Sequence, residues 1–432
     1  MRKSIAMLLV LIFLATSLTI TPLPVRAGSR MIVVPDDYPT ITTALANAVD
    51  GDTVFVKEGT YLEHQLTVNK TITLMGEDAD NTIIINVDKV DWEPSLNFAP
   101  PPAPNAIQIS ANNVVVSEFT ISFQYGWWAP IGITANGTHV IGNIVSRSGG
   151  ITVNGNNNTI SKNSFMPDVA GPFLGCIGSY NIITDNIMIR DSEESDGNLN
   201  VDGSFNLIYN NTLKSTIIEV SGNGNMIAKN NITNGGVTFN RGSLNNVIFN
   251  NRVMRLYLMG FNNTFYANEI AYVDIGGTYG SIYAANNSFY HNNFLGRRPE
   301  LGVSTKTLGL LIWNKDKEGN YWVSYDGSDA NDDGIGDLPY NVTAAYSYYD
   351  GAVREEAIID CGQDNYPLIA PFDIDSVPIR LPDWVAPSPN PSPEPQAPEP
   401  FPTALVTAAS IGSVTVVGAA LVYFKKIKRK SH

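Results

Sequence analysis

An asparagine repeat is the feature that most constrains what this chain can fold into. Segments 155–166, 178–189 and 203–214 read GNNNTISKNSFM, GSYNIITDNIMI and GSFNLIYNNTLK. Each contains one Asn, then a central apolar residue, then a second Asn five positions after the first. Steps of 17 to 25 residues separate successive copies of the second Asn, which are Asn143, Asn163, Asn186, Asn211, Asn230, Asn251, Asn268 and Asn292. Self-similarity at such a period indicates a solenoid.

Each repeat unit also contains one apolar residue that we expect to point into the core. These residues are Ile141, Ile160, Ile183, Ile208, Ile227, Ile248, Phe265 and Phe289. A single inward residue flanked by polar ones is the period-two pattern of a short strand. Because no unit has room for a helix as well, helical repeats are excluded. The repeat therefore predicts an all-β solenoid of stacked parallel strands, a β-helix.

The abundance of asparagine suggests two physical roles. Asn tolerates the left-handed backbone angles of tight turns, and stacked Asn side chains can hydrogen-bond amide to amide along an axis. Residues 151–300 contain 29 Asn, which favours internal asparagine ladders. The alternative, glycan acceptors, stays open for the eight Asn-x-Ser/Thr sequons at Asn69, Asn136, Asn157, Asn210, Asn231, Asn262, Asn286 and Asn341.

The N-terminal part of the body shows a different pattern. Residues 40–49, TITTALANAV, place Ile41, Leu45, Ala48 and Val49 at helical spacing before Gly51, which predicts an amphipathic helix. A solenoid needs its ends covered, so we expect this helix to lie across the first rung. Strands are expected at 53–56, 66–68, 71–75 and 82–85.

Two apolar segments at the chain ends predict export and membrane anchoring. Residues 1–27 have the basic start, apolar run and small-residue cleavage site of a signal peptide. Residues 403–424 form an uncharged run of 22 residues, followed at 425–432 by a basic tail. About 20 apolar residues span a bilayer, and basic flanks stay in the cytoplasm. We therefore expect a single-pass plasma-membrane protein with an extracellular body at 28–380 and a Pro-rich stalk at 381–402.

The charge balance restricts the partners of the extracellular part. Eight of the 27 basic residues lie in the two ends, which leaves 19 basic against 41 acidic residues, a net of −22, for 28–402. Nucleic acid is excluded as a partner because phosphate binding needs positive charge. The two cysteines, Cys176 and Cys361, are too few for a disulfide scaffold, although they could pair with each other.

Two stretches of sequence carry a family resemblance. Residues 40–77, TITTALANAVDGDTVFVKEGTYLEHQLTVNKTITLMGE, resemble the N-terminal cap of pectin-lyase-like right-handed β-helices. The later units, with NYW at 320–322, DANDDGIGDLPY at 329–340 and DNYPLIAP at 364–371, resemble the NosD-type group. The resemblance covers about residues 31–372 and implies a right-handed parallel β-helix with an N-terminal cap at 31–56, core rungs at 106–295 and a C-terminal region at 313–372. Because a fold does not fix a function, its functional implication is limited to carbohydrate binding or modification.

One local motif suggests a metal. The segment 329–337 places oxygen-bearing groups at the positions of a calcium loop, with Gly334 at the bend. The expected ligands are Asp329, Asn331, Asp333, the carbonyl of Ile335, and Asp337. Tyr340 replaces the usual final Glu, so Asp326 or Asp364 would have to complete the shell. The competing interpretation is a turn whose carboxylates cap their own backbone; we favour structural Ca²⁺.

Loops after the ladder asparagines supply weak candidates for catalysis. Arg147, Pro167, Arg190 and Arg255 all lie four residues past a ladder Asn. Arg190 is followed by Asp191, Glu193 and Glu194, and Asp168 lies in the loop one rung earlier. A basic group beside carboxylates suits proton abstraction next to a uronate. The alternative is a solvated acidic loop, so whether the protein is a lyase, hydrolase, epimerase or no enzyme stays open.

An aromatic segment suggests a carbohydrate contact. Tyr125, Trp127 and Trp128 interrupt the repeat, and flat aromatic faces stack on sugar rings. The NosD-type group is named for a periplasmic protein of copper-enzyme maturation, but copper is not expected here. His64, His139 and His291 are scattered without a Cys or Met cluster. The sequence thus predicts an extracellular or envelope glycan as partner. The alternative is a structural or adhesive protein that uses the β-helix as a rigid spacer.

Overall fold

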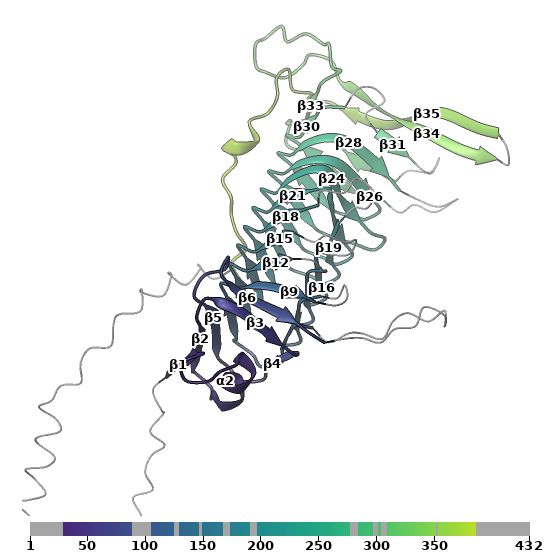
Figure 1. Ribbon diagram of the computed structural model, residues 1–432. Coiled ribbons are helices and arrows are strands. Elements are labelled where there is room, and N and C mark those ends of the chain that lie inside the picture. The colour runs from purple at the N-terminus through teal and green to yellow at the C-terminus, as the bar shows by residue number, and fades with distance from the viewer. Residues whose placement is uncertain are drawn as a thin grey trace, which may run out of the picture. The chain divides into compact units, whose positions relative to one another are not determined.

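The computed structural model describes residues 29–88, 105–124, 129–146, 149–166, 173–190, 197–276, 284–296, 301–303, 309–350 and 353–385. Within these residues the chain winds into a parallel β-solenoid (Figure 1). One compact unit ends at Ile379, and a second unit begins at Arg380. Within the described ranges no helix is long and apolar enough to cross a bilayer. The predicted signal peptide and membrane segment lie outside the described residues.

Most turns of the solenoid contribute one strand to each of three faces. The first sheet has 13 strands, which are Met31–Val34 (β1), Thr53–Val56 (β2), Thr73–Gly76 (β5), Val115–Ser117 (β8), His139–Ile141 (β11), Thr159–Ser161 (β14), Ile182–Thr184 (β17), Leu207–Tyr209 (β20), Met226–Ala228 (β23), Val247–Phe249 (β25), Thr264–Tyr266 (β27), Asn287–Tyr290 (β29) and Leu311–Ile312 (β32). Neighbours along this list pair in parallel.

The other two faces belong to one 22-stranded sheet. The second face contains Gly59–Glu63 (β3), Thr82–Asn86 (β6), Thr120–Phe123 (β9), Ile144–Ser146 (β12), Ser164–Met166 (β15), Ile187–Ile189 (β18), Thr212–Lys214 (β21), Asn293–Phe294 (β30) and Tyr321–Trp322 (β33). The third face contains Leu66–Val68 (β4), Ile107–Ile109 (β7), Ile131–Ile133 (β10), Ile151–Val153 (β13), Leu174–Cys176 (β16), Gly197–Val201 (β19), Thr216–Val220 (β22) and Leu301–Val303 (β31). Asn231–Phe239 (β24), Arg252–Leu258 (β26) and Glu269–Ile275 (β28) run through both faces and join them.

The predicted asparagine ladders are present and flank the first sheet on both sides. In the second ladder, each side-chain amide from Asn143 onward donates to the carbonyl of the next Asn, ending with Asn292 to Asn320 at 3.0 Å. Asn320 is an additional member that the repeat analysis did not include. In the first ladder, amide-to-amide bonds run from Asn181 to Asn287.

Several asparagines adopt the left-handed backbone angles that the sequence suggested, for example Asn157, Asn210 and Asn262, but the ladder asparagines do not. From Asn143 to Asn292, left-handed backbone angles are adopted by the residue just before each ladder Asn, for example Lys162, Asp185 and Phe205. The ladder asparagines are therefore selected for their amides rather than for backbone tolerance. All eight sequon asparagines are exposed, and none of them is a ladder member.

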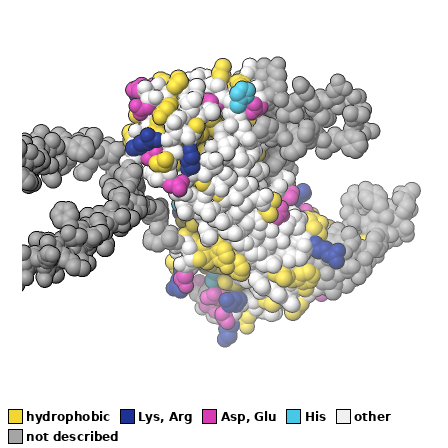
Figure 2. Space-filling model, turned by 90° about the horizontal axis from the view of Figure 1, so that it is seen from below, with side chains coloured by type: hydrophobic (Ala, Val, Ile, Leu, Met, Phe, Trp, Pro, Cys, Tyr) yellow, Lys and Arg dark blue, Asp and Glu magenta, His cyan; other side chains and the backbone are white. Residues whose placement is uncertain are grey.

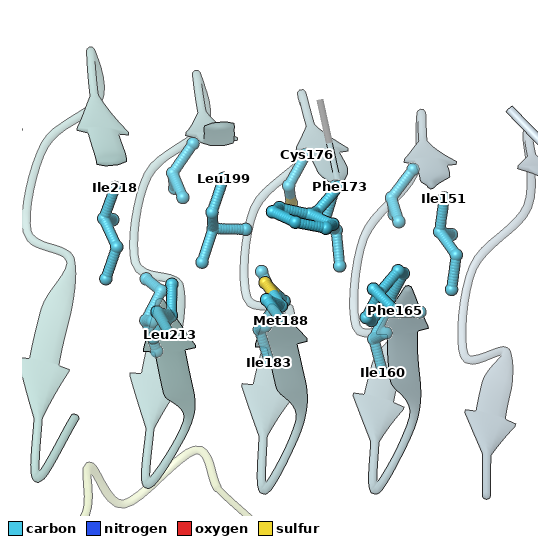
Figure 3. Close-up of a cluster of buried hydrophobic side chains, with 14 of the residues drawn as sticks. Ile151, Ile160, Phe165, Phe173, Cys176, Ile183, Met188, Leu199, Leu213 and Ile218 are labelled. Atoms are coloured by element: carbon cyan, nitrogen blue, oxygen red, sulfur yellow. The ribbon is translucent and has the colours of Figure 1, made fainter. Parts of the chain in front are cut away.

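The inward column is also as predicted, with one correction. Ile160, Ile183 and the later members are buried. Figure 3 shows Ile160 and Ile183 pointing into the interior with Phe165, Met188 and Leu199. In the first unit, however, Val140 pairs with Ile160 and is buried, whereas Ile141 pairs with Ser161 and is partly exposed. The prediction for Ile141 was wrong, because the inward residue lies three positions before the ladder Asn in the other units, and in this unit that position is Val140.

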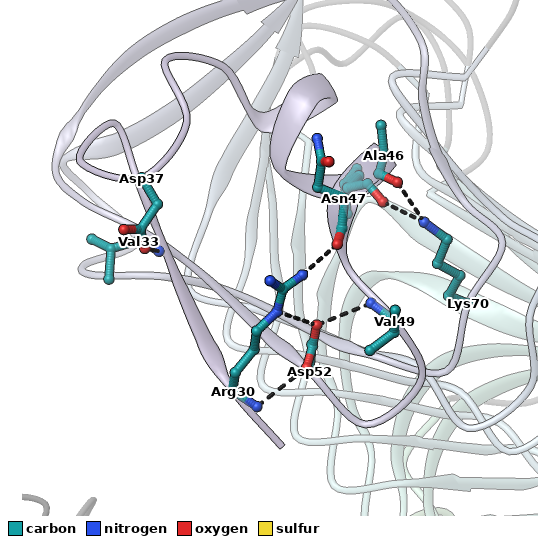
Figure 4. A network of polar contacts seen from close by, with 9 residues as sticks. Arg30, Val33, Asp37, Ala46, Asn47, Val49, Asp52 and Lys70 are labelled. Atoms are coloured by element: carbon teal, nitrogen blue, oxygen red, sulfur yellow. Dashed lines mark hydrogen bonds and ion pairs between the residues drawn. The ribbon is translucent and has the colours of Figure 1, made fainter. Parts of the chain in front are cut away.

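The N-terminal end is capped as expected. The helix α2, Ile41–Asn47, is capped by the Thr40 side chain and buries Ile41, Ala44 and Leu45 against β1 to β4. Val49, which was predicted to face the core, is exposed instead because the helix has ended before it. Figure 4 shows the polar contacts beneath the helix: Asp52 accepts from Arg30 and from Val49 N–H, and Lys70 Nζ donates to the carbonyls of Leu45 and Ala46.

The C-terminal end carries elements that the repeat did not predict. Tyr340–Asp350 (β34) continues the third face and forms an antiparallel hairpin with Val353–Asp364 (β35). Beneath it, Phe289, Phe294, Trp313 and Trp322 form a stacked aromatic interior. Cys176 and Cys361 are both buried and unpaired, so the disulfide that the sequence left open is not formed.

After the hairpin, the chain runs back along the solenoid. The main chain of Phe372 exchanges two hydrogen bonds with the Asn293 side chain, and its ring stacks on His291. Further along, Asp375 in the short helix η1, Ile374–Ser376, pairs with Arg252 at 2.7 Å. These contacts fasten residues 372–376 to the solenoid (Figure 1).

Candidate functional site

Polar side chains form a row along the outside of the third face. Strand register places one outward residue of each rung directly beside the next: Gly175, Asn200, Glu219, Thr238, Tyr257, Asp274 and Gly302. We call these residues the third-face row. Parallel strands are ~4.8 Å apart, so the row presents hydrogen-bonding groups at regular intervals along the solenoid axis.

The end of the row nearer the N-terminus has an unused acceptor. The Oδ1 atom of Asn200 is buried and has no hydrogen-bond partner among the described residues. The neighbouring Glu219 accepts from the Asn198 amide at 3.3 Å. On the other side of Asn200, a Cβ added at Gly175 would meet no described atom within 4 Å. A buried carbonyl that lacks a donor costs free energy, and the position next to it in register, Gly175, carries no side chain.

The opposite end of the row holds a charged and aromatic group. Arg255 Nε lies 3.4 Å from Asp274 Oδ2, and the Arg255 guanidinium lies 5.7 Å from the centre of the Tyr272 ring. The Arg255 side chain is 65% exposed, whereas that of Asp274 is only 28% exposed. We call Arg255, Tyr257, Tyr272 and Asp274 the tyrosine–aspartate cluster.

Electrostatic coupling within this cluster appears in its pKa shifts. Burial raises the pKa of Asp274, and the Arg255 charge partly opposes that rise. Burial raises the pKa of both Tyr257 and Tyr272, and the negative charge of Asp274 adds a smaller rise. The two phenols are therefore protonated at neutral pH and serve as hydrogen-bond donors rather than as bases.

Of the predicted catalytic residues, the structure describes Arg190 alone, and Arg190 is buried. Arg190 follows β18 at the corner between the second and third faces, and its side chain is 2% exposed. Its guanidinium lies 5.2 Å from the centre of the Phe173 ring, so it packs beneath the surface. Asp168, Asp191, Glu193 and Glu194 lie outside the described residues, as do Tyr125, Trp127 and Trp128.

The residues that flank those segments share one corner of the solenoid. Three pairs of flanking residues lie where the second face meets the third: Phe123 and Ile131, Met166 and Phe173, and Arg190 and Gly197. The last two pairs are on neighbouring rungs. The described residues on either side of 167–172 therefore lie one rung before those on either side of 191–196. That corner borders the rungs of Gly175 and Asn200.

The segment predicted to bind calcium forms a turn that binds its own backbone. The Asp329 carboxylate accepts from the N–H groups of Asp333 and Gly334, at 3.2 and 2.8 Å. Asp333 accepts from Asn331 and Ile335, and Asp337 accepts from Ala330 at 2.9 Å. Over the described ranges, no group of three or more His, Cys, Asp or Glu side chains is arranged to hold a metal.

One of the two carboxylates expected to complete the calcium shell is committed elsewhere. Asp364 is fully buried and accepts from Asn320, Trp322 and Tyr366. Asp326 is exposed. The expectation for Asp364 was therefore wrong, because its carboxylate terminates an asparagine ladder.

On one face of the described residues, the charged side chains lie in small groups. Figure 2 shows acidic and basic side chains close together on the face in view, with no large area of one sign. This pattern gives no electrostatic footprint for a highly charged polymer on that face.

Comparison with protein-family models gives no match, and neither does comparison with curated proteins. Several solved structures are similar in outline. A mannuronic acid specific polysaccharide family 6 lyase from human gut microbiota is 14% identical, with a TM-score of 0.44 over 69% of this chain and 89% of that one. XylC in complex with xylose is 12% identical, with a TM-score of 0.46 over 63% of this chain and 76% of that one. The Dettilon tailspike protein is 12% identical, with a TM-score of 0.41 over 76% of each chain.

The third-face row was only partly visible in the sequence. Arg255 and Tyr257 lie four and six positions past Asn251, and Tyr272 and Asp274 lie four and six past Asn268. That shared spacing after a ladder Asn was a usable signal for the tyrosine–aspartate cluster. Asn200 and Glu219 lie 14 and 8 positions past their ladder asparagines, so no fixed spacing identified them.

Proposed function

We propose that the third face of this solenoid binds an extracellular or cell-envelope carbohydrate. The observation that carries the proposal is the buried, unpartnered carbonyl oxygen of Asn200 beside the open position at Gly175. A sugar hydroxyl has the size and the hydrogen-bond donor that this acceptor lacks. The rest of the third-face row offers further donors and acceptors at regular steps, which suits a polymer of repeated hydroxyl-bearing units.

The predicted aromatic and acidic loops fit the same proposal. Their described ends lie at the corner that borders Gly175 and Asn200. We place Tyr125, Trp127 and Trp128 at the edge of the binding face as stacking groups for sugar rings. Asp168, Asp191, Glu193 and Glu194 remain candidates for a reaction there, whereas Arg190 is better suited to support the corner.

The wider setting is also part of the proposal. We assign the chain to the right-handed β-helices of the NosD-type group, exported by the signal peptide and held at the plasma membrane by residues 403–424. The resemblance of residues 31–372 and the apolar runs at both ends support this assignment. Copper delivery is not part of it.

Titration of the full-length protein with a panel of neutral and uronate oligosaccharides tests this function. We expect a neutral oligosaccharide to bind, and the Asn200→Ala and Glu219→Gln variants to bind it about 10-fold more weakly, because each loses one hydrogen bond in a half-buried site. A matched control is Thr152→Ala, an exposed position one rung before Gly175 on the same face. If no oligosaccharide binds, or if the Asn200 and Glu219 variants bind as the control does, the spacer function becomes the better account.

A further inference from the structure

Two exposed aromatic rings lie side by side at the corner where the third face meets the first sheet. Tyr180 directly precedes the first-ladder residue Asn181, and Phe205 directly precedes Asn206 on the next rung. The ring centres are 5.3 Å apart and the ring planes differ by 12°, so the rings are stacked. Tyr180 is 39% exposed and Phe205 is 45% exposed. We call these two residues the aromatic platform.

The backbone at these two positions does not favour aromatic residues. The φ angle is +60° at Tyr180 and +57° at Phe205, and bulky L-residues rarely adopt this left-handed region. At the same turn of other described rungs the left-handed residue is Asn or Gly: Asn113, Gly137, Asn157, Gly224, Asn245, Asn262 and Asn286. Strained backbone positions that persist in a fold cluster at functional sites, so the two rings call for a role beyond the turn.

The rung that follows the platform supports it without covering it. A Cβ added at Gly224 would lie 2.7 Å from Cε1 of Phe205, so the Phe205 ring occupies the position that a side chain on this rung would take. Almost half of the Phe205 side chain is nevertheless exposed. Packing against Tyr180 and Gly224 therefore leaves apolar ring surface in water, where it is unfavourable.

The turns around the platform are uncharged and rich in hydroxyl and amide groups. Residues 155–158, 178–181, 203–206 and 222–225 read GNNN, GSYN, GSFN and GNGN. The Ser179 and Ser204 side-chain oxygens accept from the main-chain N–H groups of Ser204 and Asn223, so each hydroxyl is held by a bond that does not use its own proton. The charged residue closest in sequence to either ring, Asp202, is an exposed carboxylate.

The platform and the third-face row lie on the same rungs. Tyr180 follows Gly175, and Phe205 follows Asn200, by five residues in each case, which limits each separation to about 18 Å. Ile177, between Gly175 and Tyr180 along the chain, is 60% exposed. Apolar surface therefore continues from the row toward the platform.

We propose that the aromatic platform is a stacking subsite for one ring of a neutral sugar chain. A pyranose has an apolar C–H face that packs on an aromatic ring, and its hydroxyl groups suit the Ser and Asn side chains of the surrounding turns. This subsite rests on the proposed carbohydrate function and extends it, because it specifies where a sugar ring stacks and on which side of the third face.

The charges near the platform select a neutral sugar. A uronate would bring a negative charge to four turns that contain no Lys or Arg, next to the carboxylate of Asp202. A protein partner is a poorer occupant, because two rings and one isoleucine are a small apolar area compared with a stable protein interface.

Replacing each ring by asparagine tests the subsite without endangering the fold. Tyr180→Asn and Phe205→Asn install the residue that has the same backbone geometry at Asn157 and Asn245, so both variants should fold. Phe205→Tyr keeps an aromatic ring. The matched control is Lys162→Asn, which also changes an exposed left-handed residue, but at the corner between the first sheet and the second face.

The measurement is isothermal titration of each full-length variant with maltohexaose, cellohexaose, mannohexaose and the galacturonate hexamer. We expect one neutral hexamer to bind the native protein, the Phe205→Tyr variant and the Lys162→Asn control equally. Tyr180→Asn and Phe205→Asn should weaken that binding about 10-fold, because each removes one stacking face. Preferential binding of the galacturonate hexamer would overturn the neutral-sugar subsite.

The outcomes separate the subsite from the function that it rests on. If Asn200→Ala weakens binding while Tyr180→Asn and Phe205→Asn bind as the native protein does, the subsite is refuted and the third-face site stands. A lower melting temperature of the two Asn variants with unchanged binding would likewise refute it, since the rings would then serve packing alone. If the Asn variants weaken binding and Asn200→Ala does not, the platform binds the sugar and the third-face row does not. If no hexamer binds the native protein, both are refuted.

Discussion

Asn320 and Asp364 meet where the second asparagine ladder ends. The main-chain N–H and the side-chain amide of Asn320 both donate to Asp364 Oδ2, at 2.7 and 3.1 Å. The indole N–H of Trp322 donates to the same oxygen at 3.0 Å. Every amide of this ladder donates toward the next rung, so its last N–H groups require an acceptor, and a buried carboxylate provides it.

Replacing that carboxylate should destabilise the C-terminal end of the solenoid. Asp364→Ala leaves the main-chain N–H of Asn320 and the indole N–H of Trp322 buried without an acceptor, which should lower the free energy of unfolding by about 3 kcal/mol. The side-chain amide of Asn320 keeps the carbonyls of Phe289 and Trp313. Asp364→Asn keeps a carbonyl oxygen at this position and should cost less. Urea unfolding of the three proteins gives the comparison, and equal losses for Ala and Asn would show that the acceptor is not what matters.

The ionisation of Asp364 should also be visible in the pH dependence of stability. Burial raises its pKa above the ordinary 3.8, although hydrogen bonds from Trp322 and Asn320 oppose the rise. Between the unfolded and the folded pKa, the native state binds more protons than the unfolded state. The contribution of this group to the free energy of unfolding therefore increases as the pH falls through that window.

Asp364→Asn removes this titration and serves as the reference. The stability of the native protein relative to the variant should be constant above the folded pKa and should rise as the pH falls below it. A relative stability that falls in the same window would mean that the folded pKa is lowered instead.

Two adjacent isoleucines provide a matched test of the inward column. Ile183 is fully buried, whereas Ile182, its neighbour on β17, is partly exposed. Ile183→Asp places an unpaired charge in a dry interior. This costs about 5 kcal/mol of folding free energy and should unfold the body. Ile182→Asp should leave a folded protein. Circular dichroism spectra and melts of both variants check this, and two folded variants would contradict the column.

The inward column and ladders were predictable because they recur at fixed positions around each ladder Asn. Ile160 and Asn163 keep the same relation as Phe265 and Asn268. The third face was less predictable, because corners of different length separate it from the ladder. Asp274 and Glu219 are brought onto one row by strand pairing, which sequence spacing alone does not reveal.

The burial of Arg190 shows a second limit of the sequence. Its position after a ladder Asn and before an acidic run suggested an exposed loop. The side chain instead packs on Phe173, a residue of the neighbouring rung that is 17 positions earlier in the chain. Only the stacking of rungs brings the two together.

Calcium binding by segment 329–337 remains a prediction with a direct test. Melts of the full-length protein in excess EDTA and in Ca²⁺ should differ, because a ligand that binds only the folded state raises its stability. Asp333 is one of the expected ligands, and in the turn its carboxylate accepts from Ile335 N–H. Asp333→Ala should abolish the difference, and identical melts of the native protein in both conditions would reject the site.

The central claim is that carbohydrate lies along the third face. Cross-linking of the full-length protein by a photoreactive derivative of the neutral oligosaccharide that binds it, followed by peptide mass spectrometry, locates the ligand. We predict adducts on β19, β22, β26 and β28, which carry Asn200, Glu219, Tyr257 and Asp274, and competition by the unmodified oligosaccharide. Competable adducts confined to the outside of the first sheet or to residues 372–376 would contradict the claim.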